Sequence, residues 1–356
     1  MKQILEKIPG IRKYKKFQLV SGGISNQNYR IISPNTSKTD WLLTLYPDNK
    51  TWWKADKEEQ ITKIYKEHSI PSARIINSGY ISYQNCDYRY LLREFVEGKD
   101  LDDFLLKKKN FAPDEWRDLL TELGTILGTL HSISMTGYGL IKGKTVSGSD
   151  IKDLPSASTW QKYVDRLMVD RGLLSERLDQ GKTYGKLRGV DVQKIYKSSY
   201  ELYINYRDVL KNVSQPFLIH YDMLLKNIIV KFNLRLSRWE VSAVIDNEWV
   251  SVGDPDIDLI QIENSVYFSL FRESFKKYWS FFTKAYGRKK MISKDIGKKR
   301  IIYHMIRSLF YLIEVYRTDK EEIVARNTKN IRNIEENYRF LKRLVDQEKV
   351  DFALPR

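Results

Sequence analysis

FLIHYDMLLKNIIVKFNLRLSRWEVSAVIDNEWVSVGDPDIDL, at residues 217–259, is the stretch that decides how this chain folds. Two short apolar runs within it, 228–232 and 239–245, flank a polar turn, which is the pattern of a β-hairpin. A hairpin brings its two ends together. We therefore expect three polar side chains at those ends to gather at one place: Asp222, Asn227 and Asp246.

Two carboxylates and an amide at one place suit a hard, oxygen-preferring cation such as Mg²⁺. The same set suits phosphoryl transfer, in which one aspartate orients the attacking hydroxyl while an asparagine and a second aspartate hold the metal. We expect Asp222 to be the catalytic residue that orients the acceptor hydroxyl or accepts its proton. Asn227 and Asp246 are then the expected Mg²⁺ ligands. Glu248 can assist a second metal or bind a cationic substrate, and it can equally be an ordinary surface carboxylate.

This order of residues resembles the C-terminal lobe of the aminoglycoside phosphotransferase family, small-molecule kinases related to choline and fructosamine kinases. The resemblance rests on His-Tyr-Asp-x4-Asn from His220, on Ile-Asp at 245–246 and on Gly-Asp-Pro-x2-Asp-Leu from Gly253. The family usually reads His-Gly-Asp, so Tyr221 is a departure. The resemblance implies an α+β, two-lobed protein-kinase-like fold. A β-rich, nucleotide-binding N-lobe would span residues 1–97, and a mostly helical C-lobe with the catalytic loop and the acceptor site would span residues 98–356.

Residues 17–32, FQLVSGGISNQNYRII, read as a strand, a glycine-containing turn and a second strand. The turn resembles the short Gly-Gly-x-x-Asn loop of the same family, although an ordinary hairpin turn would look alike. Glycines permit close backbone approach, and small polar residues offer groups to phosphate oxygens. The expected nucleotide-binding residues of this turn are Gly22, Gly23, Ser25 and Asn26.

Residues 41–46, WLLTLY, align with the family's third strand, which typically carries a Lys or Arg to the nucleotide phosphates. Thr44 stands at that position here. We expect another cation to hold the phosphates, with Lys50 and Lys54 the nearest candidates; weak nucleotide affinity and loss of catalysis are the alternatives. The helix expected at 54–69 carries Glu58 at the family spacing. Without a strand cation to pair with, Glu58 is explained equally well as a solvated helix residue.

Two more strands, expected at 73–80 and 88–95, lead into REFVEGKDL, which resembles the family's hinge. An adenine ring needs exposed backbone amide and carbonyl groups, and an extended segment between two lobes offers both. We expect the nucleotide base to lie against Glu94, Phe95 and Val96, with the lobe boundary at Gly98. The plain alternative is an ordinary strand end followed by a turn.

The activity that the resemblance implies is Mg²⁺-dependent transfer of the γ-phosphate of ATP or GTP to a hydroxyl of a small molecule. An aminoglycoside-type antibiotic is the leading acceptor, with resistance as the consequence, and a metabolite such as choline or a sugar is the alternative. Thr44 keeps open a further class, a nucleotide-binding module with weak or no catalysis. The Gly-x-Gly-x-x-Gly loop, the strand lysine and the Asp-Phe-Gly motif of eukaryotic protein kinases are missing from the sequence, which argues against a protein kinase.

The rest of the chain reads mainly as helices, with a flexible Gly- and Ser-rich loop at 137–158. The helices are expected at 114–131, 160–178, 191–213, 303–316 and 319–344. Related enzymes build part of the acceptor site in the region of the second of these helices. Four polar residues are expected to be structural, as caps or braces of the catalytic loop: His131, His220, Asp254 and Asp258.

The chain has 356 residues, a formal net charge of +16 and one cysteine, Cys86. Because it also shows neither an export signal nor a membrane-spanning apolar run, we expect a cytoplasmic, monomeric protein without a membrane partner. Its lysines and arginines are scattered, which argues against nucleic acid as a partner. The one dense basic cluster, at residues 284–300, is expected to be a solvated loop and helix end. The excess positive charge would attract a nucleoside triphosphate and hinder a polycationic acceptor unless its pocket is acidic.

Overall fold

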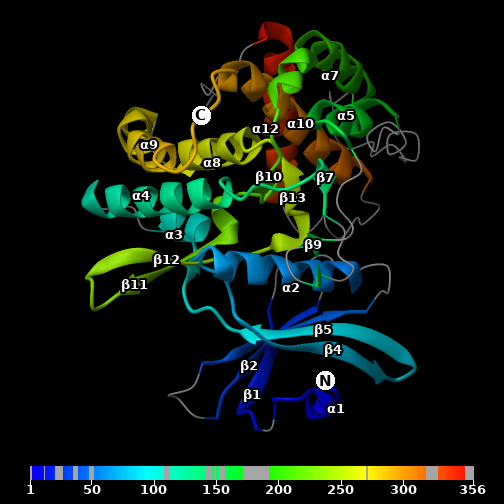
Figure 1. Ribbon diagram of the computed structural model, residues 1–356, viewed down its shortest axis with the longest axis vertical. Coiled ribbons are helices and arrows are strands. Elements are labelled where there is room, and N and C mark those ends of the chain that lie inside the picture. The colour runs from blue at the N-terminus through cyan, green and yellow to red at the C-terminus, as the bar shows by residue number, and fades with distance from the viewer. Residues whose placement is uncertain are drawn as a thin grey trace.

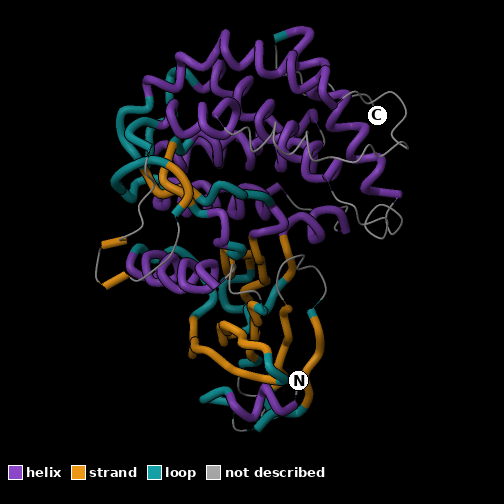
Figure 2. Tube along the Cα trace, turned by 90° about the vertical axis from the view of Figure 1, so that its right-hand side faces the viewer, coloured by secondary structure: helices purple, strands orange, loops and turns teal. Residues whose placement is uncertain are grey.

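The protein folds into a β-rich N-terminal part and a mostly helical C-terminal part (Figure 1). The computed structural model describes residues 2–11, 13–20, 27–34, 39–47, 52–107, 113–141, 146–147, 150–151, 157–170, 192–269, 272–317 and 328–348. Helices and strands are segregated in space, with most helices on one side of the molecule and the large sheet on the other (Figure 2). The two-lobed α+β architecture expected from the sequence is therefore confirmed.

The N-terminal lobe is built on one antiparallel sheet of five strands in the order β1-β2-β3-β5-β4. Its strands are β1 (Lys16–Leu19), β2 (Gln27–Ile32), β3 (Trp41–Tyr46), β4 (Ile75–Tyr83) and β5 (Cys86–Glu94). Helix α1 (Lys2–Lys7) packs on one face, and helix α2 (Trp52–Glu67) lies between the other face and the helical lobe (Figure 1).

Side-chain alternation along β3 explains why both faces of this sheet are covered. Leu43 and Leu45 join the apolar cluster on the α1 face, whereas Tyr46 packs with Ala55 of α2 on the opposite face. Thr44 is two residues from Tyr46 and therefore shares the α2 face. It is 1% exposed, so this hydroxyl is buried between the sheet and α2.

The C-terminal lobe combines helices with short strands. Its helices are α3 (Leu101–Lys107), α4 (Pro113–Leu130), α5 (Trp160–Asp165), α7 (Val192–Tyr206), α8 (Asp256–Ser269), α9 (Arg272–Gly287), α10 (Ile296–Arg317) and α12 (Thr328–Gln347). Its strands are β6 (Lys99–Asp100), β7 (Gly139–Leu140), β8 (Val146–Ser147), β9 (Asp150–Ile151), β10 (Phe217–Ile219), β11 (Ile228–Asn233), β12 (Arg238–Val244) and β13 (Ser251–Gly253). None of the helices in the described part of the chain is both long and apolar enough to cross a membrane.

The expected hairpin is present as β11 and β12, which pair antiparallel from Ile228 opposite Val244 to Asn233 opposite Arg238. The Asn233 side chain closes the turn by accepting hydrogen bonds from two backbone N–H groups. Strand β6 adds to the other edge of β11 directly after the interlobe connection. Strand β13 pairs with β10, which returns the chain beside the segment that leads into Asp222.

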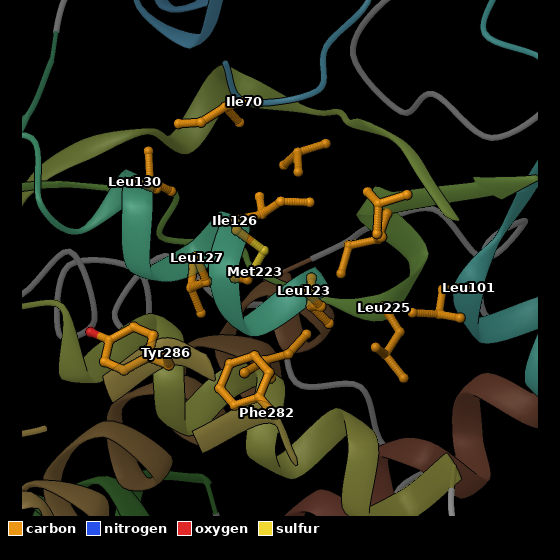
Figure 3. Close-up of a cluster of buried hydrophobic side chains, with 14 of the residues drawn as sticks. Ile70, Leu101, Leu123, Ile126, Leu127, Leu130, Met223, Leu225, Phe282 and Tyr286 are labelled. Atoms are coloured by element: carbon orange, nitrogen blue, oxygen red, sulfur yellow. The ribbon is translucent and has the colours of Figure 1, made fainter. Parts of the chain in front are cut away.

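A large apolar core anchors this hairpin and the loop before it (Figure 3). Leu123 and Leu127 of α4 pack with Phe282 and Tyr286 of α9. Met223 and Leu225 enter the same core from the loop that carries Asp222, and each is 1% exposed. Hydrophobic burial therefore fixes the backbone on the C-terminal side of Asp222.

Substitution of Gly124 by Ala should destabilise the packing of α4 on α9. A Cβ at residue 124 would lie 2.4 Å from the carbonyl oxygen of Phe282 and 3.2 Å from Ala285 Cβ. We expect the free energy of unfolding to fall by about 1–3 kcal/mol in urea denaturation, since overpacking costs that much. Gly297→Ala is the matched control, because nothing lies within 4 Å of its Cβ position. That variant should gain about 0.4–1 kcal/mol from the reduced entropy of the unfolded chain. Equal stability changes in the two variants would contradict the close packing of α4 on α9.

Two expectations about the C-terminal part need correction. The loop expected at 137–158 contains the short strands β7, β8 and β9, and other residues of it lie outside the described part. The helix expected at 160–178 is α-helical only to Asp165 and continues as a π-helical turn to Asp170. Its remainder, and residues 319–327 of the helix expected at 319–344, lie outside the described residues. The helices expected at 191–213 and 303–316 are confirmed, the first with a 3₁₀ turn at its end.

The prediction of a fully solvated basic cluster at residues 284–300 was wrong for its last two members. Lys299 is 3% exposed and bonds to the carboxylates of Asp254 and Asp256 at 2.8 and 2.7 Å. Arg300 is bidentate to Glu263. These ion pairs connect α10 to α8 and to Asp254 just before it, so the positive charges of Lys299 and Arg300 are structural.

Candidate active site

The loop between β10 and β11 brings Asp222 and Asn227 into direct contact. The amide Nδ2 of Asn227 donates to Oδ2 of Asp222 at 2.9 Å and to its backbone carbonyl at 2.8 Å. A 3₁₀ turn at Leu225–Asn227 shapes this end of the loop. Asn227 is 4% exposed. Because its buried amide makes both of these hydrogen bonds to Asp222, it fixes the carboxylate of Asp222 in one orientation.

Asp258 of α8 braces the other side of the same loop. Its carboxylate accepts hydrogen bonds from the backbone N–H groups of His220, at 2.6 Å, and Tyr221, at 2.8 Å. His131 lies 3.1 Å from the same carboxylate through Nε2, and its Nδ1 is 2.9 Å from the Tyr286 hydroxyl. The expectation that Asp258 and His131 are structural is confirmed.

Tyr221 sits in the left-handed region of backbone space, with φ of 67°. Such a conformation is free for glycine and strained for a bulky residue, which explains in physical terms why Gly suits this position. The surrounding contacts hold Tyr221 there, because its N–H is bonded to Asp258 and its carbonyl accepts from Gln261 at 2.9 Å. Its side chain is partly buried and packs against the core around α5 and α10.

Asp246 lies just after the end of β12, and its backbone is also in the left-handed region, with φ of 66°. The preceding residue, Ile245, connects the end of the hairpin to the loop that carries Asp222. Its N–H donates to the Asn227 carbonyl at 2.9 Å, and its carbonyl accepts from His220 Nε2 at 3.0 Å. The expected bracing role of His220 through a backbone contact is confirmed. The hairpin thus gathers Asp222, Asn227 and Asp246 at one end, as the sequence predicts.

The residues at this end fit a divalent cation. Burial, followed by the negative charges of Glu248 and Asp222, raises the pKa of Asp246 to about 6. The negative charges of these carboxylates are therefore only partly offset by nearby positive groups. Asn227 keeps its amide oxygen available, because both of its side-chain hydrogen bonds leave from Nδ2. Among the described residues, no group of three or more His, Cys, Asp or Glu side chains that could hold a metal ion is found. Mg²⁺ is usually held by one or two carboxylates plus substrate phosphates.

Thr44 lies in a buried polar cluster on the α2 face of the sheet. Its hydroxyl donates to the side-chain oxygen of Asn28 at 2.7 Å and accepts from the guanidinium of Arg93 at 2.8 Å. Arg93 also forms an ion pair with Glu58 of α2, whose carboxylate accepts from the Tyr46 hydroxyl. The interpretation of Glu58 as a solvated helix residue was therefore wrong. It pairs with a strand cation that comes from β5 instead of β3.

Two lysines of α2 bind the segment after Asp246. Lys54 forms an ion pair with the Glu248 carboxylate at 2.8 Å, and Lys57 donates to the Glu248 carbonyl at 2.7 Å. Burial lowers the pKa of Lys57 to about 7. Of the two lysines expected as candidates for the phosphates, Lys54 thus pairs with Glu248, and Lys50 lies outside the described residues. Sequence reasoning missed Lys57 entirely.

The expected nucleotide loop, with Gly22, Gly23, Ser25 and Asn26, lies outside the described residues. The expected hinge is described. The N–H of Glu94 donates to the Arg74 carbonyl at 2.9 Å, and that of Phe95 to the Asp40 carbonyl at 2.8 Å. Within the described part of the chain, Val96 is the hinge residue whose N–H has no such backbone bond.

Comparison with known proteins gives matches of two kinds. The phosphotransferase enzyme family matches residues 16–288, which is most of the chain. Among solved structures, the GDP and kanamycin complex of APH(2")-IIia is similar with a TM-score of 0.62 at 14% identity, covering 94% of this chain and 97% of that chain. A search of curated proteins found no match.

Two further structures are similar at 14% identity and a TM-score of 0.52. An aminoglycoside-3'-phosphotransferase of type VIII covers 87% of this chain and 99% of its own. The spectinomycin phosphotransferase APH(9)-Ia, in complex with ADP and spectinomycin, covers 95% and 92%. At such identity these likenesses establish the fold, and the family match establishes the class of chemistry. The chain belongs to the phosphotransferase enzyme family, and it is a small-molecule kinase with the two-lobed fold of the aminoglycoside kinases.

Proposed function

We propose that the protein transfers the γ-phosphate of ATP or GTP, with Mg²⁺, to a hydroxyl of a small molecule. The observation that supports this most strongly is the meeting of Asp222, Asn227 and Asp246 at one end of the hairpin. Phosphoryl transfer needs little covalent chemistry from the protein, and its rate comes from positioning and charge stabilisation. The three side chains supply both.

Each site residue has a distinct proposed role. Asp222 orients the acceptor hydroxyl and accepts its proton as the oxygen attacks the γ-phosphate. Asn227 and Asp246 hold Mg²⁺ through their side-chain oxygens. Bound there, the ion neutralises charge on the transferring phosphoryl group. We place the base against Glu94, Phe95 and Val96, and the phosphates against Gly22, Gly23, Ser25 and Asn26.

We place the boundary between the nucleotide-binding lobe, residues 1–97, and the acceptor-binding lobe, residues 98–356, at Gly98. This glycine has φ of 146°, and a Cβ there would lie 2.5 Å from the Val230 carbonyl oxygen. The close approach brings the interlobe connection directly onto β11, beside the catalytic end of the hairpin. We further propose that the protein acts as a cytoplasmic monomer.

An aminoglycoside-type antibiotic is the first proposed acceptor, with resistance as the consequence. Support comes from the fold, which is shared with structures described as complexes with kanamycin and spectinomycin. In this reading Glu248 binds an amino group of the acceptor. Its ion pair with Lys54 would then have to yield to the substrate.

A neutral or anionic metabolite, such as a sugar, is the second proposed acceptor, and one observation favours it. Burial lowers the pKa of Arg307 on α10, and the negative charge of nearby Asp222 acts in the opposite direction. Its Nη1 is buried without a hydrogen-bond partner. A positive charge within electrostatic range of Asp222 would repel a polycationic antibiotic and favour a neutral hydroxyl compound or one that carries a negative group.

Consumption of ATP and GTP, each with Mg²⁺, should be measured across a panel of aminoglycosides, neutral sugars, choline and other amino alcohols, and anionic hydroxy compounds. We expect turnover with one acceptor class, lost when EDTA removes the metal. Turnover with aminoglycosides alone would favour the first acceptor class, and turnover with sugars or anionic compounds the second. Nucleotide binding without turnover on any acceptor would favour a nucleotide-binding module. Absence of nucleotide binding would contradict the proposed function.

A further inference from the structure

Phosphoryl transfer at the proposed site needs a cation beside the nucleotide phosphates, and β3 does not supply one. The transferred group and its neighbours carry several negative charges, and positively charged side chains stabilise them in phosphoryl transfer. Thr44 is neutral, and the two described lysines of α2 nearest the site, Lys54 and Lys57, are bound to Glu248. The residues named so far leave this requirement open.

Arg93 has the position and the charge to meet it. In the antiparallel register of β3 and β5, Arg93 lies opposite Leu42, so its side chain is on the same face as Thr44. From there the guanidinium reaches across to β3, where it donates to the Thr44 hydroxyl at 2.8 Å. The guanidinium therefore brings a positive charge directly beside the side chain of residue 44.

The surroundings of Arg93 connect it to the catalytic end of the hairpin. Glu58 of α2 pairs with it, and the negative charge of Asp246 helps to raise its pKa although burial opposes this. A guanidinium has five N–H donors in a planar fork. Glu58 and Thr44 each engage one terminal nitrogen, and Nε is buried with no partner among the described residues. Donor capacity therefore remains on a fixed cation near the proposed metal ligand.

We propose that Arg93 binds the phosphates of the nucleotide and so replaces the cation that β3 lacks. This inference rests on the proposed function. Glu58 holds the guanidinium in place from α2, and Thr44 holds it from β3. Because the fork is fixed before the nucleotide arrives, little side-chain entropy is lost when phosphate oxygens bind to it.

A second arginine on the same strand provides a matched control. Arg89 is four residues from Arg93 and therefore on the same face of β5, and it also bonds α2, through Asp56 at 2.8 Å and Glu59 at 3.3 Å. Its side chain is 6% exposed, compared with 13% for Arg93. It contacts neither Thr44 nor Glu58 in the described structure. Loss of Arg89 removes a strand–helix ion pair without removing the proposed phosphate ligand.

Calorimetric titration should compare ATP, ADP and adenosine, and likewise GTP, GDP and guanosine, in three variants. Arg93→Gln should weaken binding of the nucleotides about ten- to a hundredfold, as expected for a lost charged hydrogen bond, and leave nucleoside binding unchanged. Arg89→Gln should leave both unchanged. Thr44→Lys in the Arg93→Gln background should restore part of the nucleotide affinity, because the lysine returns a cation to the same place.

Arg93→Gln leaves Glu58 buried without its partner, which can impair folding. The double variant Arg93→Gln/Glu58→Gln removes both charges and keeps the test available. The proposal is overturned if Arg93→Gln or Arg93→Gln/Glu58→Gln binds ADP as tightly as the wild-type protein does. It is also overturned if either of these two variants loses adenosine affinity and ADP affinity to the same extent. A wild-type protein that binds no nucleotide would instead contradict the proposed function, and this inference with it.

Discussion

Asp222→Asn should lower kcat by about a hundred- to ten-thousandfold, the contribution typical of a positioned general base. The amide that replaces the carboxylate is nearly the same size, and its oxygen can still accept from Asn227, as the Asp222 carboxylate does at 2.9 Å. The loop should therefore keep its shape while losing the group that receives the hydroxyl proton. Steady-state kinetics should show the loss in kcat, and calorimetry should show a nucleotide Kd close to that of the wild-type protein.

Asp208→Asn is the control for this experiment. Asp208 forms an exposed ion pair with Lys211 on the 3₁₀ turn after α7, outside the catalytic loop. Its replacement should leave both kcat and nucleotide affinity unchanged. A kcat for Asp222→Asn within a fewfold of the wild-type value would contradict the role assigned to Asp222.

Asp258→Asn should cause the largest loss of stability among single substitutions near the site. The fully buried carboxylate accepts from His220 N–H, Tyr221 N–H and His131 Nε2, and its Oδ2 takes two of these bonds. An amide has one acceptor oxygen, so at least one buried donor would face an NH₂ group. We expect the free energy of unfolding to fall by about 3 kcal/mol or more, since a buried unsatisfied group and a lost charged hydrogen bond add together.

Urea denaturation followed by circular dichroism would measure this loss. Asp346→Asn serves as the control, because Asp346 pairs with Lys342 on the exposed side of α12 and is 54% exposed. Its replacement should change stability by less than about 0.5 kcal/mol. If Asp258→Asn were as stable as this control, Asp258 would not brace the catalytic loop. Activity of the folded fraction should also fall, because the strained backbone of Tyr221 would lose its anchor.

The sequence predicted the residues at the centre of the site because one hairpin and one short loop determine their arrangement. The hairpin follows from apolar runs around a polar turn, and the contact of Asp222 with Asn227 lies within one short loop. Asp246 joins them because a hairpin returns the chain to its start. The structural roles of His131 and Asp258 were also predicted, although their contact over a long sequence separation shows only in the structure.

The sequence did not reveal how charge is distributed across the N-terminal lobe. The roles of Arg93 and Glu58 depend on the register between β3 and β5 and on the position of α2, and none of these is local in sequence. A position in a basic run predicts a solvated Lys299, yet its side chain bonds to two buried carboxylates. One signal for Arg93 was present: a strand arginine next to the hinge, in a chain whose third strand has no cation.

The most direct test of phosphoryl transfer to a hydroxyl is mass spectrometry of the acceptor after incubation with Mg²⁺ and nucleoside triphosphate. The wild-type protein should add one phosphoryl group to a hydroxyl-bearing small molecule, and Asp222→Asn should add almost none in the same time. Nucleoside diphosphate released without a phosphorylated acceptor, at equal rates in both proteins, would contradict the assignment of Asp222 and its neighbours as a kinase site.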